Sequence, residues 1–513
     1  MSLLGLVLAV VAAVLLTARL VFRPPPLTGR QPSAARLMSE RTSLGRMVAQ
    51  AARDHPDGTS GVIQLLDGID AFAARISLIR EAEETLDLQY YIWQRDATGL
   101  LLLTELRKAA ERGVRIRLLL DDNGIAGLDP DLAALDALDA VEVRLFNPFI
   151  LRWPKSLGFL WDFVRLNRRM HNKLMIADGA AAILGGRNIG NIYFAFGPGP
   201  HYLDTDVLAV GRVATEAGAD FDRYWASGSA YPARLILPAA PQGLERTATD
   251  AAKALAGPEG TAFRKALAAE PLARGLARQH VALEWAPVTL ISDNPAKGLG
   301  RARNRDMLFT QLMRVMADPD RSVDIVSAYF VPGRTFTERL VRLAGEGKRI
   351  RILTNSQEAT DVLIVHSAYV KYRPALLDGG VALYELRATP EAPREPRTPG
   401  VSTTASLHSK TVSVDRRRVF IGSFNFDPRS VMLNTEMGLL IDSPRIAAEL
   451  SRGLDEVLPW LSYGPRRDGA GQIVWRQPAQ GRAETVHRTE PGTNLTQRVF
   501  LWLLGRLPIE WLL

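Results

Sequence analysis

The chain has 513 residues, of which 47% are hydrophobic and 23% are charged. This composition excludes a small lone binding module and general disorder, and it supplies enough apolar side chains for a sizeable core. The net charge of +8 favours partners that carry phosphate, whether nucleic acid, anionic lipid or a phosphorylated small molecule. Because the chain contains no cysteine, disulfides, thiolate catalysis and zinc sites built on cysteine are excluded.

The N-terminus carries an apolar run. Residues 3–18 hold no charge, and continuing to residue 22 gives about 30 Å of helix, which is the thickness of a bilayer's hydrocarbon core. We interpret residues 1–24 as a transmembrane anchor, with a cleaved signal peptide as the alternative. Six arginines follow between positions 19 and 46, and by the positive-inside rule they favour a body on the cytoplasmic side.

Ordered structure is expected after a polar stretch. Residues 25–60, which begin within three prolines, are predicted to form a tether. Hydrophobic periodicity then predicts a strand, a helix and a strand, and the same order returns in the second half of the chain. The predicted elements are 86–92, 99–112 and 114–120 in the first half, and 323–331, 336–344 and 349–353 in the second.

Two copies of one motif indicate an internal duplication. The segments are HNKLMIADGAAAILGGRN from His171 and HSKTVSVDRRRVFIGSFN from His408. Five identities recur at a constant spacing of 237 residues: His171/His408, Lys173/Lys410, Asp178/Asp415, Gly185/Gly422 and Asn188/Asn425. We therefore predict an α/β fold with two similar sandwich halves, each a mixed sheet flanked by helices, related by a pseudo-twofold axis with one site between them.

The domain boundaries follow from this duplication. We place the first half at 61–230, a connector at 231–283, the second half at 284–461 and a tail at 462–513. An amphipathic segment at 495–513 is expected to lie in a membrane interface or to pack against the body. The Pro-rich and Arg-rich stretch at 387–406 is interpreted as a surface loop, with a flap beside the site as the alternative.

The motif residues suit phosphoryl chemistry without a cofactor or metal. In each copy the His and Lys lie two residues apart and so project from one face of a strand. One imidazole can attack phosphorus while the other protonates the leaving oxygen, and lysine and amide donors can stabilise the charge. The remaining motif candidates are two asparagine donors, one hydroxyl and three glycines that allow close backbone approach: Asn188, Asn425, Ser423, Gly185, Gly186 and Gly422.

Each histidine also needs a partner that fixes its tautomer. Matching the tripeptide DTD at 204–206 with NTE at 434–436 makes Asp206 and Glu436 the predicted orienting carboxylates. Asp178 and Asp415 are included among the catalytic candidates, although a turn or salt-bridge role fits their position in the hairpin.

Two interpretations remain open for each of the other polar residues near the motif. Arg165, Arg168 and Arg169 precede His171 and could contact a lipid phosphate or form a solvated basic run. The pair at 121–122 ends a strand, where it could line a ligand crevice or cap a turn.

The two motifs resemble the signature HxKxxxxDxxxxxxGSxN of the phospholipase D superfamily. The second copy matches it in full, whereas the first has Gly186 in place of the signature serine. Further stretches, among them LDLQYYIWQ, GGRNIGNIYF, FIGSFNFDPRS and the ending LPIEWLL, resemble bacterial cardiolipin synthases of the C type.

The resemblance implies a phosphatidyltransferase that works through a phosphohistidine. It implies phosphatidylglycerol as acceptor, phosphatidylethanolamine as expected donor, and a place at the bacterial inner membrane with phospholipid substrates and no nucleic acid. By family habit His171 attacks phosphorus and His408 protonates the leaving group, although the roles could be exchanged. His366 also resembles a family position and is a candidate to line the site. A phospholipase D hydrolase and a nuclease of the same superfamily remain alternatives.

Overall fold

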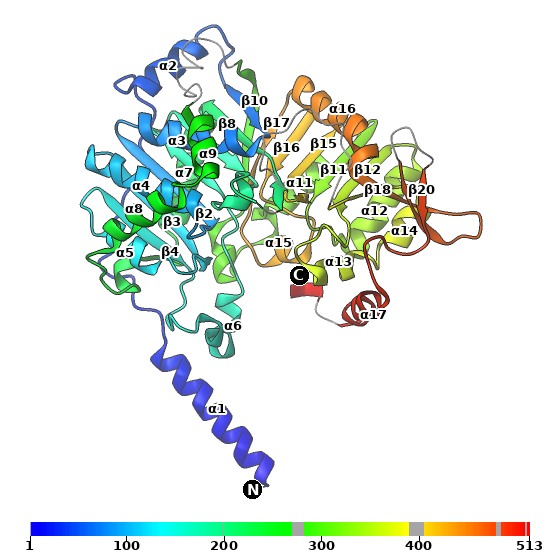
Figure 1. Ribbon diagram of the computed structural model, residues 1–513, viewed down its shortest axis with the longest axis horizontal. Helices are drawn as coiled ribbons and strands as arrows, with labels where there is room; N and C mark the ends of the chain where they lie inside the picture. The colour runs from blue at the N-terminus through cyan, green and yellow to red at the C-terminus, as the bar shows by residue number, and fades with distance from the viewer. Residues whose placement is uncertain are drawn as a thin grey trace.

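The computed structural model describes residues 2–198, 200–268, 282–388, 405–478, 484–507 and 510–512. Two α/β halves lie side by side, with helix α1 (Leu3–Val21) projecting below the first half (Figure 1). The predicted α/β fold with two similar halves is confirmed.

A mixed sheet forms the first half. Its strands are β1 (Thr59–Leu65), β2 (Thr85–Ile92), β3 (Arg115–Gly124), β4 (Val141–Phe146), β5 (Leu174–Ala177), β6 (Ala181–Gly185), β8 (Asp206–Gly211) and β9 (Ala230–Pro232). In space the order is β9-β4-β3-β2-β5-β6-β8-β1, and the pairs β2–β3 and β3–β4 are parallel while the others are antiparallel. The motif hairpin β5–β6 therefore lies in the middle of the sheet, where apolar residues on both faces are buried.

The second half repeats this order. Its strands are β10 (Glu284–Ser292), β11 (Ser322–Ser327), β12 (Arg349–Asn355), β13 (Ala382–Leu386), β15 (Lys410–Val414), β16 (Arg418–Gly422), β17 (Met437–Ile441) and β18 (Ser462–Arg467). They run in the order β18-β13-β12-β11-β15-β16-β17-β10, again with two parallel pairs. Strand β10 also pairs with β1, which joins the two sheets edge to edge. Two further strands, β19 (Ile473–Gln477) and β20 (Thr485–His487), extend the far edge.

Helices cover the faces of both sheets. Those of the first half and of the N-terminal segment are α2 (Ser43–Ala52), α3 (Gly68–Glu81), α4 (Ala97–Glu111), α5 (Asp129–Asp136), α6 (Phe159–Leu166) and α7 (Arg212–Trp225). The predicted connector contains α8 (Gly243–Ala254) and α9 (Pro258–Ala268), which pack on α4, α5 and α3. Those of the second half are α11 (Leu308–Val315), α12 (Gly333–Gly345), α13 (Leu363–Tyr369), α14 (Arg373–Asp378), α15 (Pro428–Met432), α16 (Pro444–Leu461) and α17 (Leu495–Leu504).

A shared core fixes the halves against each other. Buried apolar residues of β5, β6 and β8 pack in one cluster with those of β16 and β17, including Leu184, Val207, Val419 and Leu439. Short parallel pairing between β7 (His201–Leu203) and β14 (Ala405–Leu407) adds backbone hydrogen bonds across the junction. The motif hairpins of the two halves are thus held at one interface.

The N-terminal segment differs from the predicted tether. Residues 30–35 lie along the first half, where Arg30 donates to the carbonyl oxygens of Ala226 and Ser227, and the amide of Ala35 donates to Asp222. The chain between α1 and α2 is therefore pinned to the body, because buried arginines of the sheet also bond its carbonyls. Among the described residues α1 is the one helix long and apolar enough to cross a membrane, and none of it is buried.

Candidate active site

Both motif hairpins are pinned at their turns by an aspartate. Asp178 accepts hydrogen bonds from the amides of residues 83–85 at 2.8–3.0 Å, and Asp415 accepts from those of residues 320–322 at 2.7–2.9 Å. Both residues have positive φ, as the turn requires. The structure thus gives the motif aspartates the turn role, in place of the catalytic role for which they were candidates, because their carboxylates are used to hold the hairpins against β2 and β11.

His171 is oriented by a carboxylate of the other half. Its Nδ1 lies 2.9 Å from Oε2 of Glu436, to which Ser423 also donates at 2.5 Å. The ring contacts the edge of Tyr91, with centroids 5.0 Å apart. Its backbone amide donates to the carbonyl of Thr435, which places the histidine beside the residue that precedes Glu436.

His408 has the reciprocal arrangement. Its Nδ1 lies 2.5 Å from Oδ2 of Asp204, a residue of the first half. Its ring stacks on Tyr202 and meets the edge of Tyr193, with centroids 4.9 and 5.3 Å apart. Its backbone amide donates to the carbonyl of Leu203, the residue that precedes Asp204. Each half therefore supplies the carboxylate that orients the other half's histidine.

The prediction of Asp206 as an orienting carboxylate is wrong. Asp206 is fully buried and bonds Arg75 at 2.7 Å, with Arg187 at 3.6 Å. The strand register explains the error: Gly185 lies opposite Asp206, whereas its counterpart Gly422 lies opposite Gly438. The position equivalent to Glu436 is thus two residues before Asp206, which is Asp204. Asp204 is the first residue of the tripeptide that the sequence comparison matched with NTE. The structure shows that the correct match is shifted by two positions.

The two lysines bring the motifs into one electrostatic cluster. Lys173 and Lys410 are buried, and each donates to the carbonyl of the histidine two residues before it. Burial and, to a smaller extent, Lys410 lower the pKa of Lys173 well below its usual value, and burial also lowers that of Lys410. Burial, Lys173 and Lys410 together lower the pKa of His171 well below its usual value. This concentration of buried cations favours an anionic ligand.

The pKa values of the two orienting carboxylates are shifted in opposite directions. Burial raises the pKa of Glu436 to about 7, although Lys173 opposes this shift. Burial acts in the same direction on Asp204, but His408 and Lys410 outweigh it and hold the pKa of Asp204 below its usual range. Asp204 therefore keeps its negative charge and opposes the lowering of the His408 pKa by burial and Lys410, whereas His171 is favoured as a neutral imidazole.

The motif asparagines have different surroundings. Asn188 accepts from the amide of Ile92 and donates to Tyr193, so both ends of its amide have partners in the protein. The carbonyl oxygen of Asn425 is buried and has no hydrogen-bond partner among the described residues. Asn425 thus retains a free acceptor for a ligand hydroxyl or amine, while Asn188 also holds Tyr193 beside His408.

The missing signature serine has a steric reason. A Cβ at Gly186 would lie 2.0 Å from Oδ1 of Asp204. Aspartate is one methylene shorter than glutamate, and Asp204 reaches His408 by lying across the space that a side chain at position 186 would need. In the second half Ser423 bonds the longer Glu436 instead. Aspartate at position 204 therefore requires glycine at position 186.

Two predicted substrate-binding residues have structural contacts instead. Arg169 is 1% exposed and bonds Asp121 and the carbonyls of Phe146 and Asn147. His366 points its Nε2 at Glu490, 2.6 Å away, within the C-terminal segment. These predictions are corrected because partners within the protein already bond the Arg169 guanidinium and Nε2 of His366.

The other basic and acidic residues near the motif also pair within the protein. Arg165 bonds Asp162, and Arg168 donates to the carbonyl of Val164. Asp122 bonds Arg152 and Lys155, and Asp121 holds the amide of Met170 just before His171. The Asp121–Arg169 pair therefore positions the residues that directly precede His171.

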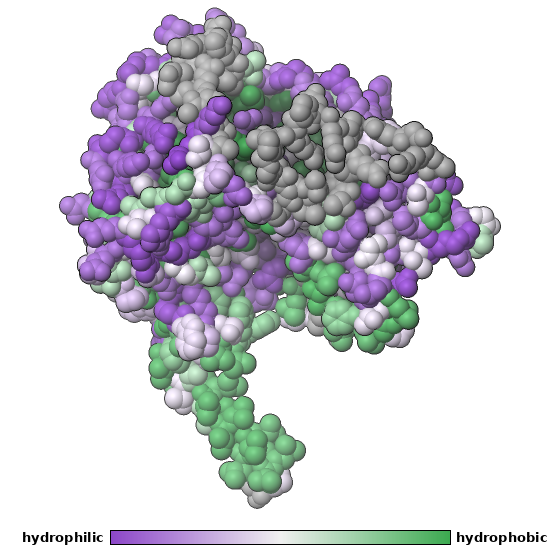
Figure 2. Space-filling model, viewed as in Figure 1, coloured by the Kyte–Doolittle hydropathy of each residue, from purple (hydrophilic) through white to green (hydrophobic). Residues whose placement is uncertain are grey.

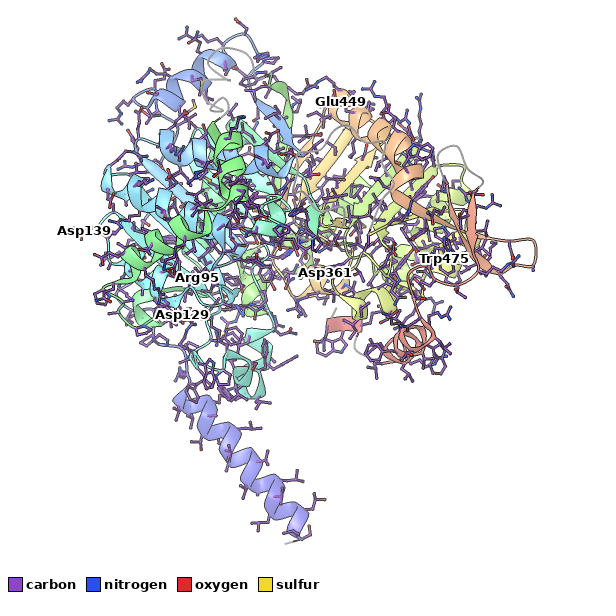
Figure 3. All side chains as sticks on the ribbon, in the orientation of Figure 1. Arg95, Asp129, Asp139, Asp361, Glu449 and Trp475 are labelled. Atoms are coloured by element: carbon purple, nitrogen blue, oxygen red, sulfur yellow. The ribbon has the colours of Figure 1, made fainter. Side chains whose placement is uncertain are left out.

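Sequence analysis missed an acidic bridge at the junction. Asp361 accepts hydrogen bonds from the hydroxyls of Tyr202 in the first half and Tyr329 in the second, both at 2.9 Å. Figure 3 places Asp361 between the halves. Tyr91 and Tyr329 are separated by almost the same number of residues as the two motifs. This repeat is the feature of the sequence that could have identified Tyr329.

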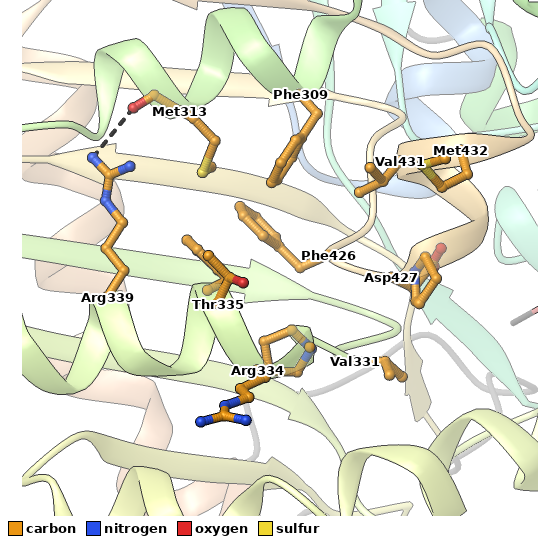
Figure 4. Close-up of a pocket in the computed structure, with 14 residues that line it drawn as sticks. Phe309, Met313, Val331, Arg334, Thr335, Arg339, Phe426, Asp427, Val431 and Met432 are labelled. Atoms are coloured by element: carbon orange, nitrogen blue, oxygen red, sulfur yellow. Dashed lines mark hydrogen bonds between the residues drawn. The ribbon is translucent and has the colours of Figure 1, made fainter. Parts of the chain in front are cut away.

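A largely apolar pocket of about 400 Å³ adjoins the second motif (Figure 4). Phe426 and Asp427, which directly follow Asn425, line it together with Phe309 and Met313 of α11. Burial raises the pKa of Asp427 to about 7. An apolar space large enough for part of a hydrocarbon chain therefore lies next to the site.

The stretch 387–406, which we interpret as a surface loop with a flap as the alternative, lies mostly outside the described residues. Within the described residues, no group of three or more His, Asp or Glu side chains is arranged to hold a metal ion.

Comparison with known proteins identifies the family. Residues 76–225 and 312–458, more than half of the chain, match the family described as "Cardiolipin synthase, PLD-like domain". The chain belongs to this family. Each of the two matched segments contains one motif and most of the repeated sheet, so the family resemblance expected from the motifs is confirmed.

Individual relatives support this membership. The chain is 42% identical to cardiolipin synthase C of Escherichia coli over 92% of its own length and 99% of the relative's. It is 24% identical to a cardiolipin synthase of Staphylococcus aureus over 82% of its length and 72% of the relative's. Among solved structures, phosphatidylserine synthase of Haemophilus influenzae matches 91% of this chain and all of that one, with a TM-score of 0.56 and 16% identity, which shows a shared fold.

Proposed function

We propose that this member of the cardiolipin synthase family transfers a phosphatidyl group to phosphatidylglycerol through a phosphohistidine, with phosphatidylethanolamine as the donor. The observation that carries the proposal is the pair of crossed contacts, His171–Glu436 and His408–Asp204, in one buried cationic cluster. The name of the Escherichia coli relative supports the acceptor reaction. The apolar pocket and the apolar helix α1 favour a lipid substrate over a nucleic acid.

The difference between the carboxylates supports separate roles for the histidines. In both rings Nδ1 is engaged by a carboxylate, which leaves Nε2 for chemistry. His171, whose pKa is lowered most by burial and cations, is neutral and acts as the nucleophile. His408, which Asp204 stabilises as an imidazolium, acts as the general acid.

The proposed reaction has two displacements at phosphorus. Nε2 of His171 attacks the donor phosphorus, the bond to the head-group oxygen breaks, and His408 gives its proton to that oxygen. His408 then takes the proton from the acceptor hydroxyl, whose oxygen attacks phosphorus while the N–P bond breaks. Lys173, Lys410 and the side-chain amide nitrogen of Asn425 provide donors for the phosphoryl oxygens in both steps.

Lipid analysis in a cardiolipin-null bacterial host tests the activity. Cells that express the protein are extracted with and without a supply of phosphatidylethanolamine, and new cardiolipin is expected only with both lipids present. A His171→Ala variant at equal abundance is the control. Absence of new cardiolipin in every condition contradicts the proposal, and accumulation of phosphatidic acid in its place favours the hydrolase.

Adduct trapping tests the roles. Acid quenching with labelled donor followed by peptide mapping is expected to place the phosphatidyl group on His171. An adduct on His408 in the His171→Ala variant would reverse the assignment.

We place the catalytic body on the cytoplasmic side of the inner membrane, as the arginines after α1 suggest.

A further inference from the structure

Two helices outside the catalytic site expose apolar faces. They are α6 with the segment before it and α17 with the segment after it. Their large exposed apolar residues are Trp153, Leu157, Leu160, Phe163 and Val164 in the first region, and Leu495, Val499, Phe500, Trp502, Leu503, Leu507 and Trp511 in the second. Both regions lie at the lower side of the molecule in Figure 1, and Figure 2 shows hydrophobic surface over them and over α1. Apolar surface gathered on one side marks an interaction site.

Helix α6 contacts the end of the apolar helix α1. Phe22, at the C-terminal end of α1, stacks on Trp161 of α6 with ring centroids 5.2 Å apart. If α1 spans the bilayer, its end lies at the level of the lipid head groups, where aromatic residues are enriched. In that case this contact would hold α6 at the membrane surface. Helix α6 ends at Leu166, five residues before His171.

The C-terminal segment is tied to the same region. Arg429 donates to the carbonyl of Asn167, just after α6, at 2.9 Å and to the carbonyl of Leu512 at 3.1 Å. Glu510 bonds Lys371 and the hydroxyl of Tyr372. The end of the chain is thus anchored between the two apolar regions, and Arg429 also contributes to the cationic field at His171.

A basic pocket of about 420 Å³ lies behind α17. Its lining includes the rings of Trp475 and Trp502 and four cations, of which Lys371 pairs with Glu510 and Arg488 with Asp468, while the other two are Arg498 and Arg506. Arg506 lies over Trp502, with the guanidinium carbon 3.4 Å from the ring centroid. Among the described residues neither Arg498 nor Arg506 has an acidic partner within 4 Å. The acidic lining residue, Glu490, is occupied by Arg373 and His366.

We propose that α6, α17 and residues 510–512 form an interfacial membrane-binding surface beside α1, and that the pocket behind α17 binds the phosphate of an anionic phospholipid. The occupant is a lipid bilayer because the surface continues from α1, combines exposed tryptophans with arginines that have no acidic partner among the described residues, and has a pocket for phosphate below its apolar face. This surface would hold the residues between α6 and His171 close to the lipid head groups. The inference concerns docking and does not depend on the reaction proposed above.

Depth-dependent fluorescence in the full-length protein tests this surface. Because the chain has no cysteine, a single cysteine can be introduced and labelled without background. Val164→Cys on α6 and Leu503→Cys on α17 are labelled with an environment-sensitive fluorophore, and the protein is reconstituted into vesicles of phosphatidylethanolamine and phosphatidylglycerol. Glu449→Cys on α16, at the opposite side of the molecule in Figure 3, is the matched control.

Both test probes are expected to shift to the blue and to be quenched by lipids that carry a quencher near the head group, whereas the control probe does neither. Test probes that remain in an aqueous environment overturn the proposal. A blue shift without quenching by lipid also overturns it, because it indicates contact with a second copy of the protein.

Charge removal tests the pocket. Arg498→Gln with Arg506→Gln is expected to shift the docking equilibrium of α17 by up to about 30-fold, read from the quenched fraction at position 503. The charge-matched control is Arg445→Gln with Arg452→Gln on α16. Vesicles without phosphatidylglycerol should mimic the loss, and excess inorganic phosphate should not. Equal quenching in the double variant, or release by inorganic phosphate, contradicts a lipid head group in the pocket.

Discussion

The exchange of carboxylates between the halves makes a sharp prediction for Asp204→Asn. Asp204 is 4% exposed and lies 2.5 Å from Nδ1 of His408, so its charge acts on the imidazolium with little screening by water. Asparagine keeps the size of the side chain and removes the charge. We expect the variant to fold and to lose the acid function of His408.

The magnitude follows from the hydrogen bond that is lost. A hydrogen bond to a charged group contributes about 1.5–3 kcal/mol, which corresponds to about 1–2 pKa units and a factor of about 10–150. Burial, Lys410 and Lys173 already lower the pKa of His408, and Asp204 opposes them. Removing Asp204 therefore lowers the pKa of His408 further and reduces the protonated fraction at neutral pH by the same factor.

The assay is the pH dependence of kcat/KM for head-group release in mixed vesicles. Because a general acid must be protonated, kcat/KM falls as the pH rises through the pKa of His408 in the free enzyme. We expect this alkaline limb to lie below the ordinary histidine value in the wild type, and about 1–2 pH units lower in Asp204→Asn. The value of kcat/KM at neutral pH should fall about 10–150-fold.

Asp206→Asn is the matched control two residues away. Its carboxylate bonds the buried Arg75 and does not contact either histidine, so its loss should destabilise the fold by about 3–5 kcal/mol without moving the alkaline limb. Wild-type kcat/KM and an unchanged limb in Asp204→Asn would refute the reasoning. A shifted limb in Asp206→Asn with normal behaviour of Asp204→Asn would restore the sequence-based assignment.

Three further substitutions separate the roles of other residues. Glu436→Ala should remove the acceptor that orients His171 and slow formation of the covalent adduct by about 2–10-fold, as expected for a neutral hydrogen bond, measured by rapid quench of labelled donor; an unchanged rate contradicts this role. Gly186→Ser, although it restores the signature residue, should lower kcat because the new Cβ collides with Asp204; a faster enzyme would show that the loop gives way. Arg169→Gln should reduce the free energy of unfolding by about 3–5 kcal/mol through the unpaired Asp121, with KM unchanged in the folded fraction; a raised KM at normal stability would return Arg169 to the substrate site.

The sequence predicts the halves well because the motif hairpins have equal lengths. All five identities keep the spacing of 237, and hairpins of equal length fit equivalent places in two sheets of the same order. The orienting carboxylates could not be matched in this way. Asp204 lies sixteen positions after Asn188, whereas Glu436 lies eleven positions after Asn425, so the spacing changes to 232 inside a loop where no hydrophobic pattern sets the register.

Long-range pairing explains the other differences. Arg169 has the appearance of a phosphate ligand because it stands two residues before His171, but its partner Asp121 lies 48 positions earlier at the end of β3. The segment 25–42 has the composition of a tether, yet Arg30 and Ala35 bond α7 and the residues after it, almost 200 positions away. Neither pairing leaves a local pattern in the sequence, because both depend on which surfaces the tertiary fold brings together.

The crossed histidine–carboxylate contacts constrain how the two halves can evolve. A change at Asp204 acts on His408, and a change at Glu436 acts on His171, so a compensating change has to arise in the opposite half. Gly186 with Asp204 and Ser423 with Glu436 are two solutions of the same packing problem, and each can be exchanged only as a pair. Although the repeats can diverge in their outer helices, they remain bound together at the junction, and cutting the chain in the connector would leave each fragment with a histidine that lacks its carboxylate.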